Sequence, residues 1–228
     1  MSSLAGSPTE NGQQGELSFW QHYPEAWIDN LAHYRPVFPF ESIDYSREIL
    51  DVGSGPKTVF EEIAPAHARI IPADTLADEF NRLMPDKRFP VVATIPARKF
   101  RLITLFNMID HMERPEELLA QLVEHLAEDG ELWLYVHLDR PYDPVEHPQC
   151  YRFWQVAPLM QKFFTIKSCG IENRIPSING FWCVCTQKGK SREVRSLRWS
   201  RTLGGIYASN VIRRYAQGLH RRIRSTSR

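Results

Sequence analysis

The feature that most constrains the fold is a strand-like run that ends in a glycine turn, ILDVGSGPKT at residues 49–58. The apolar residues of this run predict a buried strand, and Gly53 and Gly55 follow it without side chains, so a ligand can approach the backbone. We expect a helix after the turn, whose free N–H groups and positive dipole end would face that ligand. Open α/β sheets bind ligands at such turns, at the carboxyl end of the first strand.

Three classes of ligand compete for this turn. A phosphate-binding P-loop is excluded because the turn is too short and has Pro56 where the second glycine belongs. A dinucleotide fingerprint requires a third glycine, which Thr58 replaces. S-adenosylmethionine is the third class, and Asp51 could pair with its ammonium and sulfonium charges. Asp74 follows the next expected strand and could accept hydrogen bonds from ribose hydroxyls or cap a helix beginning near Leu76.

Strand-like and helix-like segments alternate along most of the chain, which predicts a doubly wound, mostly parallel α/β sheet. The clearest helix is Pro115–Glu128, with proline in its first turn, a leucine-rich stripe and Asp129-Gly130 as its stop. We expect the last two strands to form an antiparallel pair at one edge. The expected strands are 48–52, 69–73, 100–107, 131–138, 163–169 and 181–186.

The run ILDVGSGP resembles the first motif of class I S-adenosylmethionine-dependent methyltransferases. FRLITLFNMIDHMERPEELLAQLVEHLAEDGELWLYV resembles the family's fourth strand, its loop, helix and fifth strand, and the similarity covers about residues 40–187. It implies a Rossmann-like fold, S-adenosyl-L-methionine as cofactor and a cytoplasmic transferase. The cofactor-binding residues that it implies are Asp51, Gly53, Ser54, Gly55, Pro56, Asp74 and Asn107.

Two shorter phrases, ADTLADEFNRL and HPQCYRFW, are similar to phrases in small bacterial methyltransferases of polysaccharide and glycolipid biosynthesis. This similarity implies O-methylation of a sugar or lipid-linked saccharide. The sequence departs from the family pattern at Lys57, where a glycine is common, and at Arg101, where an aspartate is common. No acidic residue ends the third strand, where Ala93 and Thr94 stand. An alternative is therefore a non-catalytic, methyltransferase-like interaction subunit.

Transfer to a hydroxyl requires a group that takes up its proton, and histidine is the commonest base near neutral pH. His111 follows the fourth methyltransferase-like strand, at the rim where an acceptor would approach, although it could equally pack under the next helix. His137 shares a strand face with Trp133 and Tyr135. We rank His111 before His137 as the catalytic base, and Asp110 could orient either one.

Other clusters favour structural interpretations. His137 and His147 stand among three acidic residues but lack the spacing of a known metal motif, so we expect no metal site. Cys183 and Cys185 would share one strand face as packed apolar residues. The aromatic stripe from Phe19 to Phe40 could form either a lid over the site or core.

The charge is distributed unevenly, although the net charge is only +1. Residues 191–228 hold ten arginines and one acidic residue, which gives +9. We expect a basic amphipathic helix at 208–224 that binds an anionic membrane surface, or docks on the acidic body; nucleic acid is an unlikely partner. The expected divisions are a disordered 1–17, a methyltransferase-like domain at 18–190 and this extension. The protein would lie in the cytoplasm, peripheral to the inner membrane face.

Overall fold

The computed structural model describes residues 2–4, 10–23, 31–32, 34–138, 148–172 and 179–189. The basic extension 191–228 and the loop that holds His147 lie outside the described residues. Within the described ranges, no helix is long and apolar enough to cross a membrane. In chain order the elements are β1 (Ser2–Ser3), α1 (Glu10–His22), η1 (Phe40–Ser42), β2 (Glu48–Val52), β3 (Arg69–Ala73), α3 (Ala77–Leu83), β4 (Thr94–Ile95), β5 (Phe100–Phe106), η2 (Ile109–His111), α4 (Pro115–His125), β6 (Leu126–Leu138), α5 (Phe153–Phe163), β7 (Phe164–Glu172) and β8 (Asn179–Gln187).

A six-stranded sheet in the order β3-β2-β5-β6-β8-β7 forms the centre of the molecule. The neighbours from β3 to β6 pair in parallel, while β8 pairs antiparallel with both β6 and β7. This arrangement confirms the expected α/β fold class and the antiparallel pair at one edge. Because β2, β3, β5 and β6 run the same way, their carboxyl ends meet along one edge of the sheet.

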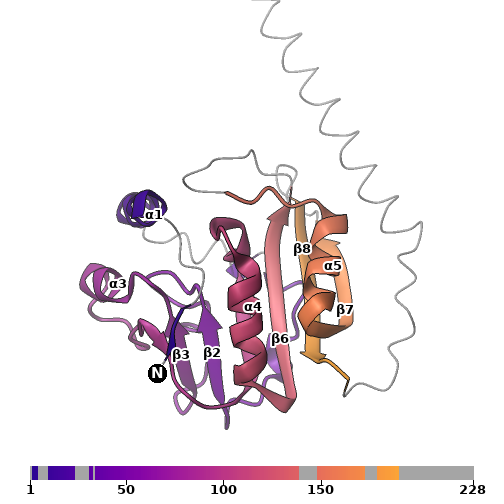
Figure 1. The fold of residues 1–228 in the computed structure, drawn as a ribbon. Helices are drawn as coiled ribbons and strands as arrows, with labels where there is room; N and C mark the ends of the chain where they lie inside the picture. The colour runs from indigo at the N-terminus through magenta and orange to yellow at the C-terminus, as the bar shows by residue number, and fades with distance from the viewer. Residues whose placement is uncertain are drawn as a thin grey trace, which may run out of the picture.

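Helices α4 and α5 cover one face of the sheet, side by side (Figure 1). Leu118, Leu119 and Leu122 of α4 are fully buried there, as the leucine-rich stripe predicts. Cys183 and Cys185 of β8 also lie in this core, with their sulfur atoms 3.5 Å apart, which confirms that they are packed core residues.

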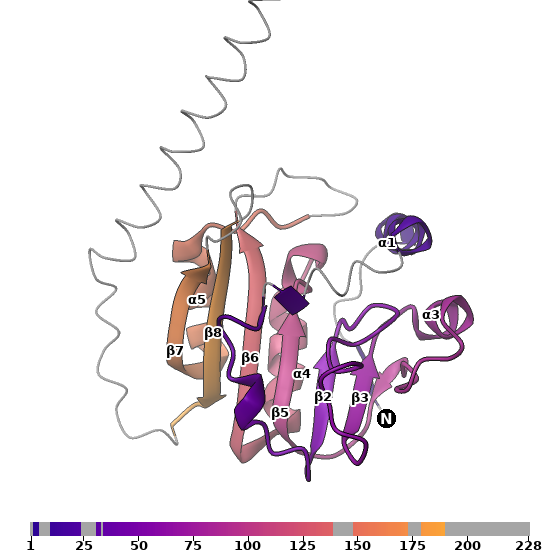
Figure 2. The same ribbon diagram turned by 180° about the vertical axis from the view of Figure 1, so that it is seen from behind.

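An aromatic cluster covers the opposite face, where the segment containing η1 crosses the sheet (Figure 2). Phe38 stacks on Trp133 with ring centroids 5.1 Å apart and nearly parallel planes, and Tyr34 lies 4.3 Å from Phe106. The later part of the aromatic stripe is therefore core. On this face a segment whose only described helices are short covers the sheet, and its large rings provide the apolar area that a long helix would otherwise supply.

Helix α4 is shorter than expected, since β6 begins at Leu126 directly after it. Leu126 has extended backbone angles and pairs with Phe100, and the register shifts before the next pairs. Gly130 lies in this irregular stretch, where a Cβ atom would come within 2.9 Å of the Phe100 carbonyl oxygen. Thus the Asp129-Gly130 pair lies in the irregular stretch of the strand where its register to β5 shifts, rather than at the helix end.

The prediction of a helix after the glycine turn is wrong. Residues 53–68 form turns and irregular segments, and Ala64 N–H donates one helix-type hydrogen bond to the Phe60 carbonyl, four residues earlier. Phe60 is fully buried in the aromatic cluster, and Pro65 limits the length available for a helix. The dipole argument for ligand binding at this turn therefore does not apply.

The first helix is a second departure, because residues 10–17 were expected to be disordered and are helical. Trp20, in the following turn of α1, is 6% exposed and packs with Leu76, Phe80 and Val91. This apolar contact with a distant part of the chain compensates for the polar composition of the helix. The remaining domain boundaries stay predictions.

Candidate active site

The glycine turn lies where β2 ends, and its two glycines need positive φ angles, 69° at Gly53 and 64° at Gly55. A Cβ atom on Gly53 would lie 2.6 Å from the sulfur of Met108, which follows β5. Both the backbone angle and this close approach exclude a larger residue. The turn is thus clamped against the carboxyl end of the neighbouring strand.

Asp51 lies under the turn with both carboxylate oxygens engaged. Thr58 donates a hydroxyl hydrogen bond of 2.5 Å to Oδ2, and Thr104 donates one of 2.6 Å to Oδ1. Burial raises the pKa of Asp51 to about 6, while the two hydroxyl bonds oppose that rise. Thr58 stands where a dinucleotide site would have glycine, and its hydrogen bond to Asp51 holds the end of the turn against the strand. The pairing of Asp51 with the cofactor's charges stays a prediction.

Asp74 follows β3 and faces the same turn. Its Oδ2 accepts a 3.2 Å hydrogen bond from Gly55 N–H, and its Oδ1 accepts one of 3.1 Å from Leu76 N–H just before α3. Burial, helped by the nearby charge of Glu16, raises the pKa of Asp74 to about 7, against the effect of these backbone bonds and of His111. Asp74 therefore joins the glycine turn to the start of α3, which is compatible with both sequence interpretations.

The rest of the turn is held by Ser54, a predicted cofactor-binding residue, and by Lys87, which the sequence did not indicate. Ser54 donates its hydroxyl to the Gly55 carbonyl at 3.0 Å. Lys87 donates to the carbonyls of Pro56, at 2.9 Å, and Phe80, at 2.8 Å. Burial lowers the pKa of Lys87 to about 8. Lys87 thereby links the glycine turn to the carboxyl-terminal part of α3. This contact is visible only in the three-dimensional structure.

Helix α1 lies beyond the carboxyl ends of the parallel strands (Figure 1) and covers the turn. A Cβ atom on Gly55 would lie 2.9 Å from the Trp20 ring. The Trp20 indole N–H donates to Glu16 at 3.1 Å, and the other Glu16 oxygen lies 3.7 Å from Nδ1 of His111. In the early part of the aromatic stripe, Trp20 is thus a core residue that packs on the turn, and a ligand that lies on Gly55 would have to displace it. A lid over the site stays a prediction.

The predicted catalytic residues separate into two groups. His111, 20% exposed in its side chain, lies by α1, and its Nε2 is 4.0 Å from Oδ2 of Asp110, which is longer than a hydrogen bond. Asp110 is 1% exposed and held within η2. His137 is 4% exposed and meets the Tyr135 ring edge-on at 5.7 Å, on the side of the aromatic cluster. His111 is thus the histidine that lies beside the glycine turn.

Asn107 follows β5 and lies between the glycine turn and the aromatic cluster, because it bonds to Tyr135 and Tyr34 and is followed by Met108. Its backbone N–H donates to the Tyr135 carbonyl at 2.8 Å, and its side-chain amide donates to the Tyr34 hydroxyl at 2.9 Å. The next residue, Met108, packs on Gly53.

The described parts of the chain contain no group of three or more His, Cys, Asp or Glu side chains that could hold a metal ion. Of the acidic and histidine cluster considered as a metal site, residues 139–147 are outside the described residues.

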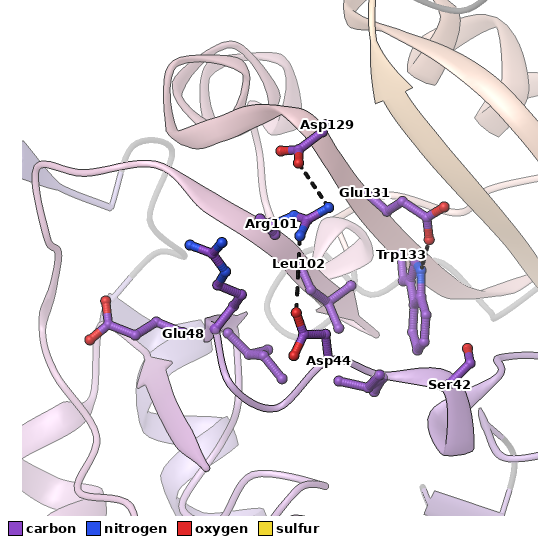
Figure 3. Close-up of a pocket in the computed structure, with 11 residues that line it drawn as sticks. Ser42, Asp44, Glu48, Arg101, Leu102, Asp129, Glu131 and Trp133 are labelled. Atoms are coloured by element: carbon purple, nitrogen blue, oxygen red, sulfur yellow. Dashed lines mark hydrogen bonds and ion pairs between the residues drawn. The ribbon is translucent and has the colours of Figure 1, made fainter. Parts of the chain in front are cut away.

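A cavity of about 280 Å³ lies at the other end of the sheet, where β2, β5 and β6 begin (Figure 3). Arg101 reaches Asp129 at 2.8 Å and Asp44 at 4.0 Å, and Trp133 donates its indole N–H to Glu131 at 3.0 Å. Arg101, a departure from the family pattern, therefore serves an ion-pair cluster. This cavity lies at the opposite end of the strands from the glycine turn and from the predicted cofactor-binding residues.

The residues at the carboxyl ends fit S-adenosylmethionine. Two buried acids, Asp51 and Asp74, flank the turn, and Met108 and Trp20 pack against its two glycines. Beside them, Oδ1 of Asn107 is buried without a hydrogen-bond partner among the described residues. Asp51, Asp74 and Asn107 would hold a cationic ligand that also carries hydrogen-bond donors.

The comparisons with known proteins agree with this arrangement. A family model described as "Methyltransferase domain" matches residues 19–191. No curated protein sequence matches the chain significantly. Among solved structures, the chain is similar to a TehB-like SAM-dependent methyltransferase from Corynebacterium glutamicum, with 16% identity, a TM-score of 0.54 and coverage of 77% of this chain and 100% of that one.

Two further structures share the fold. A Burkholderia thailandensis 1,6-didemethyltoxoflavin N1-methyltransferase, which has bound S-adenosylhomocysteine, shows 16% identity and a TM-score of 0.59, over 82% of this chain and 93% of that one. The N-methyltransferase NodS from Bradyrhizobium japonicum shows 15% identity and a TM-score of 0.52, over 72% and 98%. At these identities the likenesses concern the fold, while the family match covers most of the sequence. The chain therefore belongs to the methyltransferase domain family and is a class I S-adenosylmethionine-dependent methyltransferase.

Proposed function

We propose that this methyltransferase methylates a hydroxyl group of a sugar or lipid-linked saccharide and that His111 is the catalytic base. The observation that carries the proposal is the position of His111 beside the glycine turn, between two carboxylates. Glu16 lies 3.7 Å from its Nδ1 and Asp110 lies 4.0 Å from its Nε2. The two carboxylates thus face different ring nitrogens of the imidazole that would take up the acceptor's proton.

When bound, S-adenosylmethionine supplies an electrophilic methyl group on its sulfonium sulfur. Transfer would join the acceptor oxygen to that methyl carbon and return the carbon–sulfur bonding electrons to sulfur. His111 would take up the hydroxyl proton, so that no net charge accumulates on the acceptor oxygen. The buried hydrogen bond from Thr58 to Asp51 holds the turn in one conformation, which favours an in-line approach of the two reactants.

His137 is the second candidate base. Its ring lies edge-on to Tyr135 and is almost completely buried, so an acceptor reaches it only by entering the aromatic cluster. His111 retains about one fifth of its side-chain surface. Accessibility therefore supports the order in which the sequence analysis ranked the two histidines.

The saccharide acceptor is supported by the phrases ADTLADEFNRL and HPQCYRFW. In the first phrase, Asn81 exchanges two hydrogen bonds with the backbone of Val91, and Phe80 is fully buried. These contacts pack α3 against the segment that contains Val91. The ten arginines of residues 191–228 support a location at an anionic membrane surface, where a lipid-linked acceptor would be found.

The test is transfer of radiolabelled methyl groups from S-adenosylmethionine to a panel of sugars, nucleotide sugars and lipid-linked saccharides. Substituting His111→Gln should lower the turnover of an accepted saccharide by about 10²–10⁴-fold, the usual contribution of a general base. His67→Gln, at an exposed histidine in the turn before β3, is the matched control and should keep full activity.

Normal turnover of the His111→Gln variant would reject His111 as the base, and an equivalent loss in His137→Gln would point to the second candidate. If the wild type binds cofactor but methylates none of these hydroxyl acceptors, the saccharide proposal is wrong. The interaction-subunit alternative, with which the Trp20 ring over Gly55 is compatible, would instead be favoured by a folded wild type that binds no cofactor.

A further inference from the structure

The end of β5 adopts an unusual backbone conformation at Asn107. Its φ angle is 50°, and it is the one non-glycine residue with a positive φ among those that the structure describes. L-residues adopt this left-handed region reluctantly, although asparagine tolerates it better than most, and such residues concentrate at functional sites. The backbone N–H of Asn107 donates to the Tyr135 carbonyl at 2.8 Å, which holds the turn in place.

The side-chain amide of Asn107 is only half satisfied. Its Nδ2 donates to the Tyr34 hydroxyl at 2.9 Å, whereas its Oδ1 is buried and has no hydrogen-bond partner among the described residues. Buried acceptors are nearly always paired in native proteins, and an unpaired one next to a ligand site is explained by a donor on the ligand. The strained backbone and the unpaired oxygen therefore occur on the same residue.

Tyr34 is what fixes this amide. The Tyr34 ring is 1% exposed and lies between Phe106, at 4.3 Å, and Tyr135, at 5.0 Å between ring centroids. These contacts leave the phenol oxygen little freedom to move. Because Nδ2 is directed to that oxygen, Oδ1 is kept as an acceptor, although Tyr34 and Asn107 are 73 residues apart in the sequence.

The position of Asn107 indicates which donor it receives. The following residue, Met108, packs on Gly53 at the start of the turn, whereas Asp74 meets Gly55 at its far side. Asp74 can accept from hydroxyl groups there. On the Asn107 side, the cofactor's ammonium group offers three N–H donors and a positive charge, which suits a buried oxygen that has no other partner.

We propose that Tyr34 is a positioning residue, which orients Asn107 so that its Oδ1 accepts a hydrogen bond from the methionine ammonium of the cofactor. This inference rests on S-adenosylmethionine as the cofactor but not on the saccharide acceptor. Tyr34 does not take part in the methyl transfer itself. Its role is to make the site selective for a cofactor that keeps its amino-acid part.

The experiment is calorimetric titration of two probes that differ in that part. S-adenosylhomocysteine carries the ammonium, while 5′-methylthioadenosine has the same nucleoside and thioether without it. Tyr34→Phe keeps the ring packing and removes the hydroxyl, so S-adenosylhomocysteine should bind about tenfold more weakly, as expected for losing an oriented bond to a charged group, with methylthioadenosine unchanged. Tyr45→Phe, a half-buried tyrosine packed on Phe60 of the same face, is the matched control.

A second variant covers the possibility that Tyr34→Phe does not fold. Asn107→Gly permits the positive φ angle and removes Oδ1, and it should show the same selective loss. Equal weakening of both probes, or no weakening in either variant, overturns the inference. A wild type that binds neither probe also overturns it, but in that case the use of S-adenosylmethionine fails as well, which distinguishes the two conclusions.

Discussion

Substituting Gly53→Ala tests how tightly the glycine turn is clamped. The new Cβ would lie 2.6, 2.8 and 2.9 Å from the Sδ, Cγ and Cβ atoms of Met108, closer than real Cβ contacts come, on a backbone with φ of 69°. The left-handed conformation costs an alanine about 1–2 kcal/mol, and overpacking a filled site costs about 1–3 kcal/mol more. We therefore expect the free energy of unfolding to fall by about 2–5 kcal/mol.

Gly189→Ala is the control that separates the two contributions. Gly189 also has a positive φ, 87°, but a Cβ there would have no atom within 4 Å. It should lose only the conformational part, about 1–2 kcal/mol. Urea unfolding followed by far-ultraviolet circular dichroism gives both values, provided that the slopes of the two transitions agree. If Gly53→Ala is no less stable than Gly189→Ala, the close packing of Met108 on the turn is refuted.

Two further predictions concern charge. Because the pKa of Asp74 is raised from 3.8 to about 7, the folded chain holds an extra proton between those values, so its stability should fall as pH rises from 4 to 7, by roughly 4 kcal/mol. Asp74→Asn should flatten this decline in urea unfolding, whereas exposed Asp86→Asn should not; equal pH slopes in the two variants would contradict the burial of Asp74. Deleting residues 191–228 should abolish co-sedimentation with phosphatidylglycerol vesicles, while phosphatidylcholine vesicles should bind neither chain. Full binding by the shortened chain would show that the arginines are not the membrane contact.

The strands and the cofactor edge could be predicted because their signals are local. Glu48–Val52 and Arg69–Ala73 match the expected ranges residue for residue. These strands and β5 pair in parallel, as predicted, and their common direction brings Gly53, Asp74 and Asn107 to one edge. Predicting the cofactor required only these positions and a family resemblance.

The features that the sequence did not reveal depend on contacts between distant residues. The turn after Gly55 is not helical because Thr58 bonds to Asp51 and Phe60 enters the aromatic core. Lys87 reaches Pro56 across 31 residues. No periodicity or spacing encodes such bonds. The density of aromatic residues before β2 did, however, indicate a lid or core.

The most direct test of the central claim is calorimetric titration of S-adenosylmethionine and S-adenosylhomocysteine into the wild type and Asp74→Asn. We expect micromolar binding of both ligands to the wild type, about −8 kcal/mol. Binding to the variant should be clearly weaker, because the asparagine amide has one acceptor oxygen where the carboxylate has two. Absence of binding to a folded wild type would contradict the assignment of the glycine turn as a cofactor site. Equal binding by the variant would remove Asp74 from it.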